Sequence, residues 1–152
     1  MVYRQPPPQC LEKCLGNNNR QKGRIGELFV CYILEKFGYQ TAFVDTQGYD
    51  VIVNYKKRPI RIQVKSALSR DYNRKKGGKP RYNFATNIGA EKRKYTKEDA
   101  DIIALFGSDH ETVIFKLVDE IKTKTHKLSE AHFYDKSIMK QSFERCLESC
   151  SV

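Results

Sequence analysis

Four polar residues in the first half of the chain have types and a spacing that suit metal-assisted chemistry. They are Glu27, Asp50, Gln63 and Lys65. Asp50 offers a carboxylate oxygen and Gln63 a carbonyl oxygen, which are ligands that a hard cation such as Mg²⁺ or Mn²⁺ prefers. Glu27 could bind a second cation or hold a water, and Lys65 could position that water or offset charge developing on a phosphate. The set therefore predicts phosphodiester hydrolysis with a divalent cation as cofactor.

A helix is expected to carry the first of these residues. The apolar pattern predicts a helix over residues 20–37 that ends at Gly38. Glu27 lies at the head of a largely apolar face of this helix, which continues through Val30 and Leu34. A carboxylate in such a place is costly unless it has a partner, so we expect Glu27 to have one.

A pair of strands is expected to carry the other three. Apolar and polar residues alternate over 60–66, which is the period of a half-buried strand, so Gln63 and Lys65 project from the same face. A strand over 49–55 and the Pro-containing turn that follows it suit an antiparallel hairpin with this strand. The hairpin would bring Asp50 beside Gln63 and Lys65.

Shorter elements are predicted around this core. Strands are expected over 39–44 and 82–86, a helical turn over 91–95, a hairpin of 101–106 with 112–117, and a helix over 129–150. No internal repeat is visible in the sequence. The chain therefore reads as a single domain over 1–152, in which an N-terminal arm, 1–19, precedes a catalytic core, 20–120.

The charge of the chain predicts a polyanionic partner. There are 28 Lys and Arg residues against 18 Asp and Glu, which gives a net charge of +10. A basic segment over 70–83 follows the strand of Lys65 closely and is expected to contact DNA. The residues proposed for this contact are Arg70, Tyr72, Asn73, Arg74, Lys75, Lys76, Lys79, Arg81 and Asn83. The alternative is a solvated loop that touches phosphates without reading sequence.

Several other classes of protein are not supported. No apolar run is long enough to span a membrane, and the N-terminus lacks the apolar stretch of a secretory signal, so a cytoplasmic protein is expected. There is no glycine-rich loop for a nucleotide cofactor. The spacing of Cys10 with Cys14 and of Cys146 with Cys150 leaves a zinc site open, but small buried apolar residues are the favoured interpretation.

Three motifs, taken in order, resemble those of a known family. Gly23-Arg-Ile-Gly-Glu27, Gly48-Tyr-Asp50 and Ile62-Gln-Val-Lys65 resemble the PD-(D/E)xK nuclease superfamily, most closely the branch of cyanobacterial group I intron homing endonucleases. The resemblance implies an α/β fold with an αβββαβ core, a central mixed sheet flanked by helices, a divalent cation and cleavage of double-stranded DNA. Two departures are Tyr49, where the family name has Pro, and Gln63, where an acid is usual.

The resemblance leaves three functions to separate. The first is a site-specific homing endonuclease. The second is a structure-specific nuclease similar to a Holliday-junction resolvase, and the third is a catalytically silent DNA-binding protein that retains the fold. A further alternative is an ordinary ion pair of Glu27 with Lys65. One active site cuts one strand, so a homo-oligomer is expected; symmetry alone suggests a dimer, and the resemblance favours a tetramer.

Overall fold

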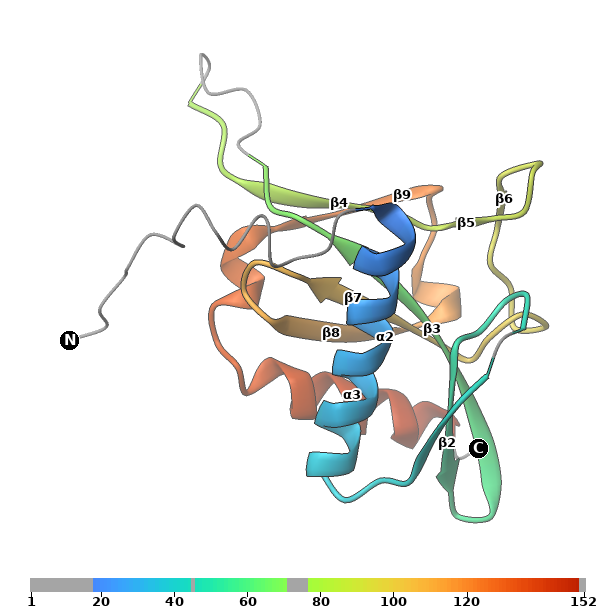
Figure 1. Ribbon diagram of the computed structural model, residues 1–152. Coiled ribbons are helices and arrows are strands. Elements are labelled where there is room, and N and C mark those ends of the chain that lie inside the picture. The colour runs from blue at the N-terminus through green and yellow to red at the C-terminus, as the bar shows by residue number, and fades with distance from the viewer. Residues whose placement is uncertain (1–17, 45, 71–76, 151–152) are drawn as a thin grey trace.

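A five-stranded mixed sheet with two helices on one face forms the centre of the molecule. The computed structural model describes residues 18–44, 46–70 and 77–150 (Figure 1). The strands of the sheet follow the order β1-β2-β3-β7-β8. Their bounds are Thr41–Phe43, Val51–Tyr55, Arg58–Ala67, Ile102–Gly107 and Thr112–Leu117. β3 and β7 are parallel and the other neighbours are antiparallel, which confirms the mixed α/β sheet.

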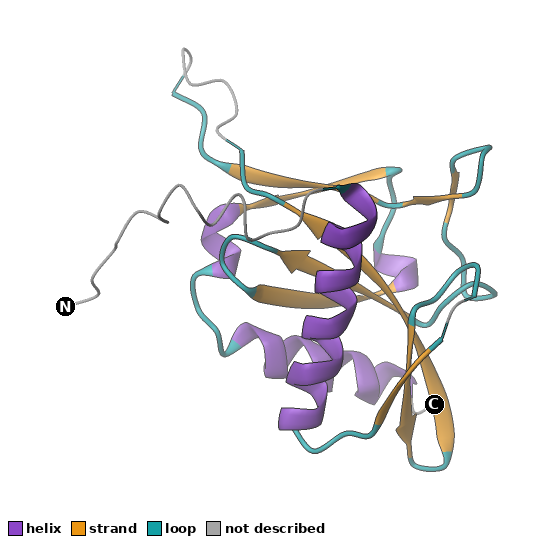
Figure 2. Ribbon diagram, viewed as in Figure 1, coloured by secondary structure: helices purple, strands orange, loops and turns teal. Residues whose placement is uncertain are grey.

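Helices α2 (Asn19–Lys36) and α3 (Ile138–Cys150) pack on the same face of this sheet. The apolar side of α2 meets Val64 and Phe106, and α3 lies along β8 (Figure 2). Asn18 caps α2 by accepting a hydrogen bond from the Gln21 backbone N–H at 2.9 Å. The predicted helix is therefore confirmed to within one residue at each end.

The hairpin of β2 and β3 is also confirmed. Lys56 and Lys57 both have positive φ, at 50° and 62°, which is the conformation of a tight turn whose twist matches that of the flanking strands. The turn is shorter than predicted, because β3 already begins at Arg58. The register pairs Val51 with Ile62, so the start of β2 lies beside the middle of β3.

Strands cover the opposite face of the sheet. β4 (Arg81–Ala85) pairs with β9 (Thr125–Ser129), and the short β5 (Asn87–Ile88) pairs with β6 (Arg93–Lys94). Their apolar side chains pack against Ile103 and Leu105 of β7 in a second core cluster. Between β3 and β7, the described residues form β4, β5 and β6 and contain no helix, so the second helix of the expected αβββαβ order is missing from this part of the chain.

Two predicted elements need correction. The expected helical turn over 91–95 is instead the hairpin of β5 and β6, because Gly89 and Lys92 both have positive φ, at 75° and 50°. β9 was not expected and takes the start of the predicted tail helix. After it come the 3-10 turn η3 (Glu130–Phe133) and α3, so the tail helix begins only at Ile138. A further 3-10 turn, η2 (Val118–Glu120), follows β8.

Two further features are the lack of an apolar helix among the described residues and the burial of Cys146. No helix in the described residues is long and apolar enough to cross a membrane. Cys146 is fully buried in the core beside α2 and the sheet, which agrees with a small apolar residue, and burial raises its pKa to about 12. Cys10 and Cys14 lie outside the described residues, as does nearly all of the arm 1–19.

Candidate active site

Asp50 lies at the point where β2 and β3 separate. Its backbone N–H donates to the Ile62 carbonyl at 2.9 Å, which is the last backbone contact of this hairpin. Its carboxylate oxygen Oδ2 then accepts two hydrogen bonds, from the Val64 N–H at 3.0 Å and from Gln63 Nε2 at 2.5 Å. The carboxylate therefore accepts hydrogen bonds from β3 at the point where the backbone of a paired strand would otherwise accept them. These bonds fix it against β3.

Gln63 and Lys65 project from the same side of β3, as predicted. Gln63 is only 7% exposed, and its amide nitrogen also donates to the Val64 carbonyl at 3.1 Å. Burial lowers the pKa of the Lys65 ammonium, and the carboxylate of Asp50 opposes part of that shift. The structure thus brings Asp50, Gln63 and Lys65 into one group.

Glu27 shares a hollow with Asp50, although Gln63 and Lys65 do not line it. The hollow has a volume of about 670 Å³ and is lined by side chains of α2 and of the segment before β2. Those side chains are Asn18, Arg20, Gln21, Arg24, Glu27, Phe43, Val44 and Asp50. Arg24 lies 3.7 Å from the Glu27 carboxylate, so Glu27 has the partner that its position requires. Arg24 was not singled out from the sequence.

Two glycines allow the backbone to approach closely around the site. A Cβ added at Gly26 would lie 2.1 Å from Ser66 Oγ, so α2 can cross β3 at this height only without a side chain there. Gly48 has a φ of 112°, and a Cβ added there would lie 3.1 Å from the Asp99 carbonyl oxygen. The close approach at Gly26 positions Glu27, and the close approach at Gly48 positions the turn that leads to Asp50.

Tyr95 is part of the site and was missed by sequence reasoning. Its ring is 8% exposed, and the Lys65 ammonium lies 4.9 Å from the ring centroid. Burial, with a smaller effect of the Asp50 carboxylate, raises the pKa of Tyr95 to about 12, so the phenol stays neutral. No sequence motif marks Tyr95, because the whole basic segment separates it from β3.

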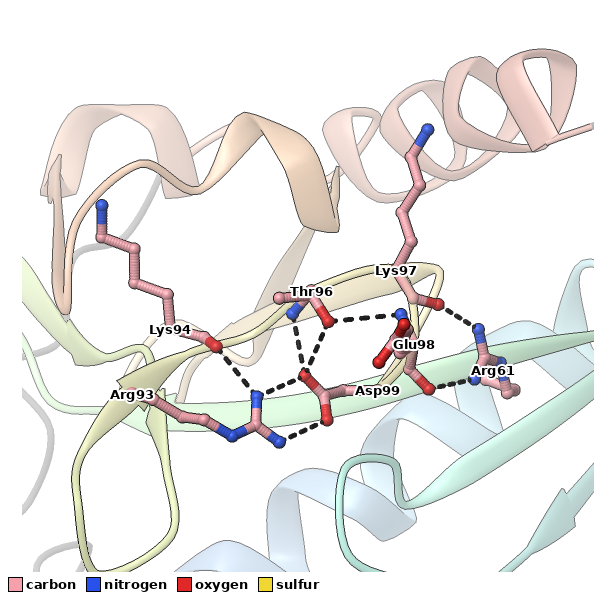
Figure 3. A network of polar contacts seen from close by, with 7 residues as sticks. All are labelled: Arg61, Arg93, Lys94, Thr96, Lys97, Glu98 and Asp99. Carbon is pink, nitrogen blue, oxygen red and sulfur yellow. Dashed lines mark hydrogen bonds and ion pairs between the residues drawn. The ribbon is translucent and has the colours of Figure 1, made fainter.

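A polar network holds the loop that carries Tyr95 (Figure 3). Arg93 binds both oxygens of Asp99, at 2.8 and 2.7 Å, and the Thr96 N–H donates to Asp99 at 2.9 Å. Arg93 is the main reason that the pKa of Asp99 falls to about 2. Tyr95 lies between the two residues that bind Asp99, so the bridge fixes its backbone.

Arg61 joins the same loop to the catalytic strand. Its guanidinium donates to the carbonyls of Lys97 and Glu98, at 2.5 and 2.7 Å (Figure 3). The guanidinium also binds the carboxylate of Asp101. It also lies 5.8 Å from the centroid of the Tyr49 ring, next to Asp50. Arg61 lies on β3 directly before Ile62. It therefore connects β3 with the loop of Tyr95 and with the turn of Asp50.

The basic segment is described only at its two ends. Arg70 is exposed, and its backbone exchanges two hydrogen bonds of 3.0 Å with that of Arg81. Lys79 is exposed, whereas Arg81 and Asn83 are half-buried on β4. Five of the proposed DNA contacts lie outside the described residues: Tyr72, Asn73, Arg74, Lys75 and Lys76.

A second group of possible metal ligands lies at the turn between β7 and β8. Asp109, His110 and Glu130 bring their ligand atoms within 4.8 Å of one another. His110 Nε2 lies 2.5 Å from a Glu130 oxygen, and the Tyr82 hydroxyl donates to Asp109. The sequence shows no ligand spacing here, because Glu130 comes from a segment distant from Asp109 and His110.

Known proteins share this architecture. A family model described as PD-(D/E)XK endonuclease matches residues 17–146. The chain is also similar to a solved structure described as a bacterial homing endonuclease, I-Ssp6803I. The TM-score is 0.61 at 18% identity, over 75% of this chain and 80% of that chain, and at this identity the likeness shows the fold. No curated protein matches the chain.

Proposed function

The chain belongs to the PD-(D/E)XK endonuclease family, and on that premise we propose a divalent-metal-dependent enzyme that cuts double-stranded DNA at a specific site. A homing endonuclease is the form of this activity that the structural neighbour favours. The observation that carries the proposal is the Asp50 carboxylate, fixed to β3 beside Gln63 and Lys65 and sharing a hollow with Glu27. A catalytically silent protein would have no need to keep this acid beside a buried lysine.

The side chains around Asp50 fit a divalent cation. Oxygen donors of Asp50 and Glu27 face one hollow, and the amide nitrogen of Gln63 donates to Asp50, which leaves its carbonyl oxygen as the acceptor. Hard cations such as Mg²⁺ and Mn²⁺ prefer such oxygens. When bound, the cation polarises the phosphate and makes water easier to deprotonate.

Lys65 acts on the phosphate or on the attacking water. Its ammonium lies over the Tyr95 ring and interacts electrostatically with the Asp50 carboxylate, which favours one placement of the side chain before substrate arrives. A cation fixed in this way stabilises charge that develops on the phosphate more effectively than a mobile one, because it needs no reorganisation. The Arg24 guanidinium, 3.7 Å from the Glu27 carboxylate, lines the same hollow and pairs with this acid.

DNA binding is proposed for the basic segment 70–83 and the surface that adjoins it. The net charge of +10 favours the phosphate backbone, and Arg70 and Lys79 are exposed at the described ends of the segment. Two strands must be cut, so we expect a homo-oligomer, a dimer or a tetramer, whose mass light scattering can measure.

The test is cleavage of plasmid, long linear duplex and a four-way junction with Mg²⁺, Mn²⁺ or EDTA. We expect the duplex to be cut with the cations and not with EDTA, and Asp50→Ala and Lys65→Ala to lower the rate by at least 100-fold. Asp119→Ala removes an exposed carboxylate on η2 and is the matched control. Cleavage that survives Asp50→Ala contradicts the assigned site. Cutting of junctions alone points to a resolvase, and absence of cutting on all substrates points to a binding protein.

A further inference from the structure

The ribbon of β4 and β9 forms a small sheet of its own with two different faces. Its register pairs Arg81 with Ser129 and Asn83 with Lys127. Because side chains alternate along a strand, Tyr82 and Phe84 point inward, where both are fully buried. Arg81, Asn83 and Lys127 belong to the other, outer face of the ribbon, whose strands lie at one end of the molecule (Figure 1).

The outer face is polar and positively charged. It consists of Arg81, Asn83, Ala85, Thr125, Lys127 and Ser129. Ala85, Thr125 and Lys127 are exposed, and the other three are half-buried. The stretches 80–87 and 122–129 contain no Asp or Glu, while Lys122 and Lys124 add two more cations beside the ribbon. A face of this composition attracts a polyanion along its whole length.

The ribbon is joined directly to the catalytic strand. β3 ends at Ala67, and three residues later Arg70 forms its backbone bridge with Arg81. Asn83 and Arg70 line a hollow of about 270 Å³ together with the end of β3. The chain from Lys65 to Arg70 covers about five residue steps and spans at most about 17 Å, which corresponds to about five base pairs. A duplex held at Lys65 therefore passes the ribbon within one helical turn.

We propose that the outer face of the β4–β9 ribbon enters the major groove and reads base edges, with Asn83 and Lys127 as the contacting pair. The major groove is wide enough to admit a two-stranded β-ribbon. The ammonium of Lys127, which is exposed, suits the acceptors of guanine, and the amide nitrogen of Asn83 can donate to N7 of a purine, whereas its Oδ1 is buried. The proposal rests on the proposed function, since it takes duplex DNA as the substrate, and it adds β9 to an interface expected only from 70–83.

The experiment is selection of binding sites from a randomised duplex library in EDTA, where no cutting occurs. The proteins are the wild type, Asn83→Ala, Lys127→Ala and, as a matched control, Lys140→Ala on the exposed side of α3. We expect the wild type and the control to enrich the same motif. Each ribbon variant should lose preference at one or two base pairs by about five-fold or more, with the rest of the motif unchanged. Thermal melting checks that the variants are folded.

Two results would overturn the proposal. One is a uniform loss of affinity with an unchanged motif, because a contact to phosphate alone behaves in that way. The other is a wild type that enriches no motif. Cleavage is measured in parallel by adding Mg²⁺ to the same randomised library and sequencing the new ends, which detects cutting whether or not a motif is enriched. If a motif is enriched but no DNA is cut, the base-reading role of the ribbon stands and the nuclease activity is contradicted. If DNA is cut but no motif is enriched, the nuclease activity stands and the base-reading role is contradicted.

Discussion

The ammonium of Lys65 lies over the ring of Tyr95, 4.9 Å from its centroid, although the basic segment separates the two residues in the chain. An aromatic face attracts a cation and at the same time limits where it can lie. Tyr95 is held in turn by the bridge of Arg93 to Asp99, and its loop by Arg61. The candidate active site thus includes a supporting layer that comes from a hairpin on the other side of the basic segment.

Replacing Tyr95 should slow cleavage through its effect on Lys65. We expect Tyr95→Leu to lower the single-turnover rate by about ten-fold, since a cation–π contact is worth roughly 0.5–2 kcal/mol. Tyr95→Phe retains the ring and should retain most of the rate. Equal losses for Leu and Phe would show that the hydroxyl matters rather than the ring face.

The bridge of Arg93 to Asp99 should make the hairpin of β5 and β6 sensitive to acid. The folded-state pKa of Asp99, about 2, is lower than its ordinary value of 3.8. The stabilisation is therefore complete above about pH 4 and is lost as the pH falls toward 2. Amide hydrogen exchange between pH 5 and 2 should show opening of residues 93–99 in this window. In Arg93→Ala the opening should be present already at pH 5, and identical profiles would contradict this assignment.

A methyl group at Gly26 should separate α2 from β3. Gly26→Ala places Cβ against Ser66 Oγ, and we expect it to destabilise the fold by about 1–3 kcal/mol and to lower activity further by moving Glu27. Gly23→Ala is the matched control, because nothing lies within 4 Å of its Cβ. In that variant better helix propensity should stabilise the protein by about 0.5–1 kcal/mol. Urea unfolding measures both; a Gly26→Ala protein as stable as Gly23→Ala would refute the close contact.

Restoring an acid at position 63 should make stability depend on metal. Gln63→Glu replaces the amide that donates to Asp50 with a second carboxylate, so the pair repels in the absence of a cation. We expect a lower melting temperature in EDTA and a larger rise on adding Mg²⁺ than in the wild type. Gln141→Glu, on the exposed side of α3, should change neither value. Melting temperatures unaffected by the change at 63 would place Gln63 outside the cation site.

The part of the site that depends on local pattern was predictable from the sequence. Alternation over 60–66 and a tight turn are enough to place Asp50 beside Gln63, because both effects act within one hairpin. Tyr95 and β9 were not predictable in the same way, since their partners lie far away in the chain. The polar stretch of β9 has only one apolar residue, Leu128, and becomes a strand because β4 supplies its hydrogen bonds.

The predicted start of the tail helix and the predicted helical turn at 91–95 were wrong for related reasons. An apolar pattern does not show that Ser129 ends a strand, and a turn built on positive φ at Lys92 is invisible to propensity. The assignment of roles to Glu27, Asp50, Gln63 and Lys65 stays a prediction that the cleavage experiments test.

The pairing of β4 with β9 also has a consequence for the order of folding. β9 follows β7 and β8 in the chain, so β4 must wait for its partner until the central sheet has been made. Closing such a long loop is slow, and it becomes favourable once the sheet provides a surface to pack against. All four candidate catalytic residues leave the ribosome before this second strand does. The proposed catalytic residues are therefore synthesised before the proposed base-reading ribbon is complete, and we expect the ribbon to be among the last parts of the molecule to form.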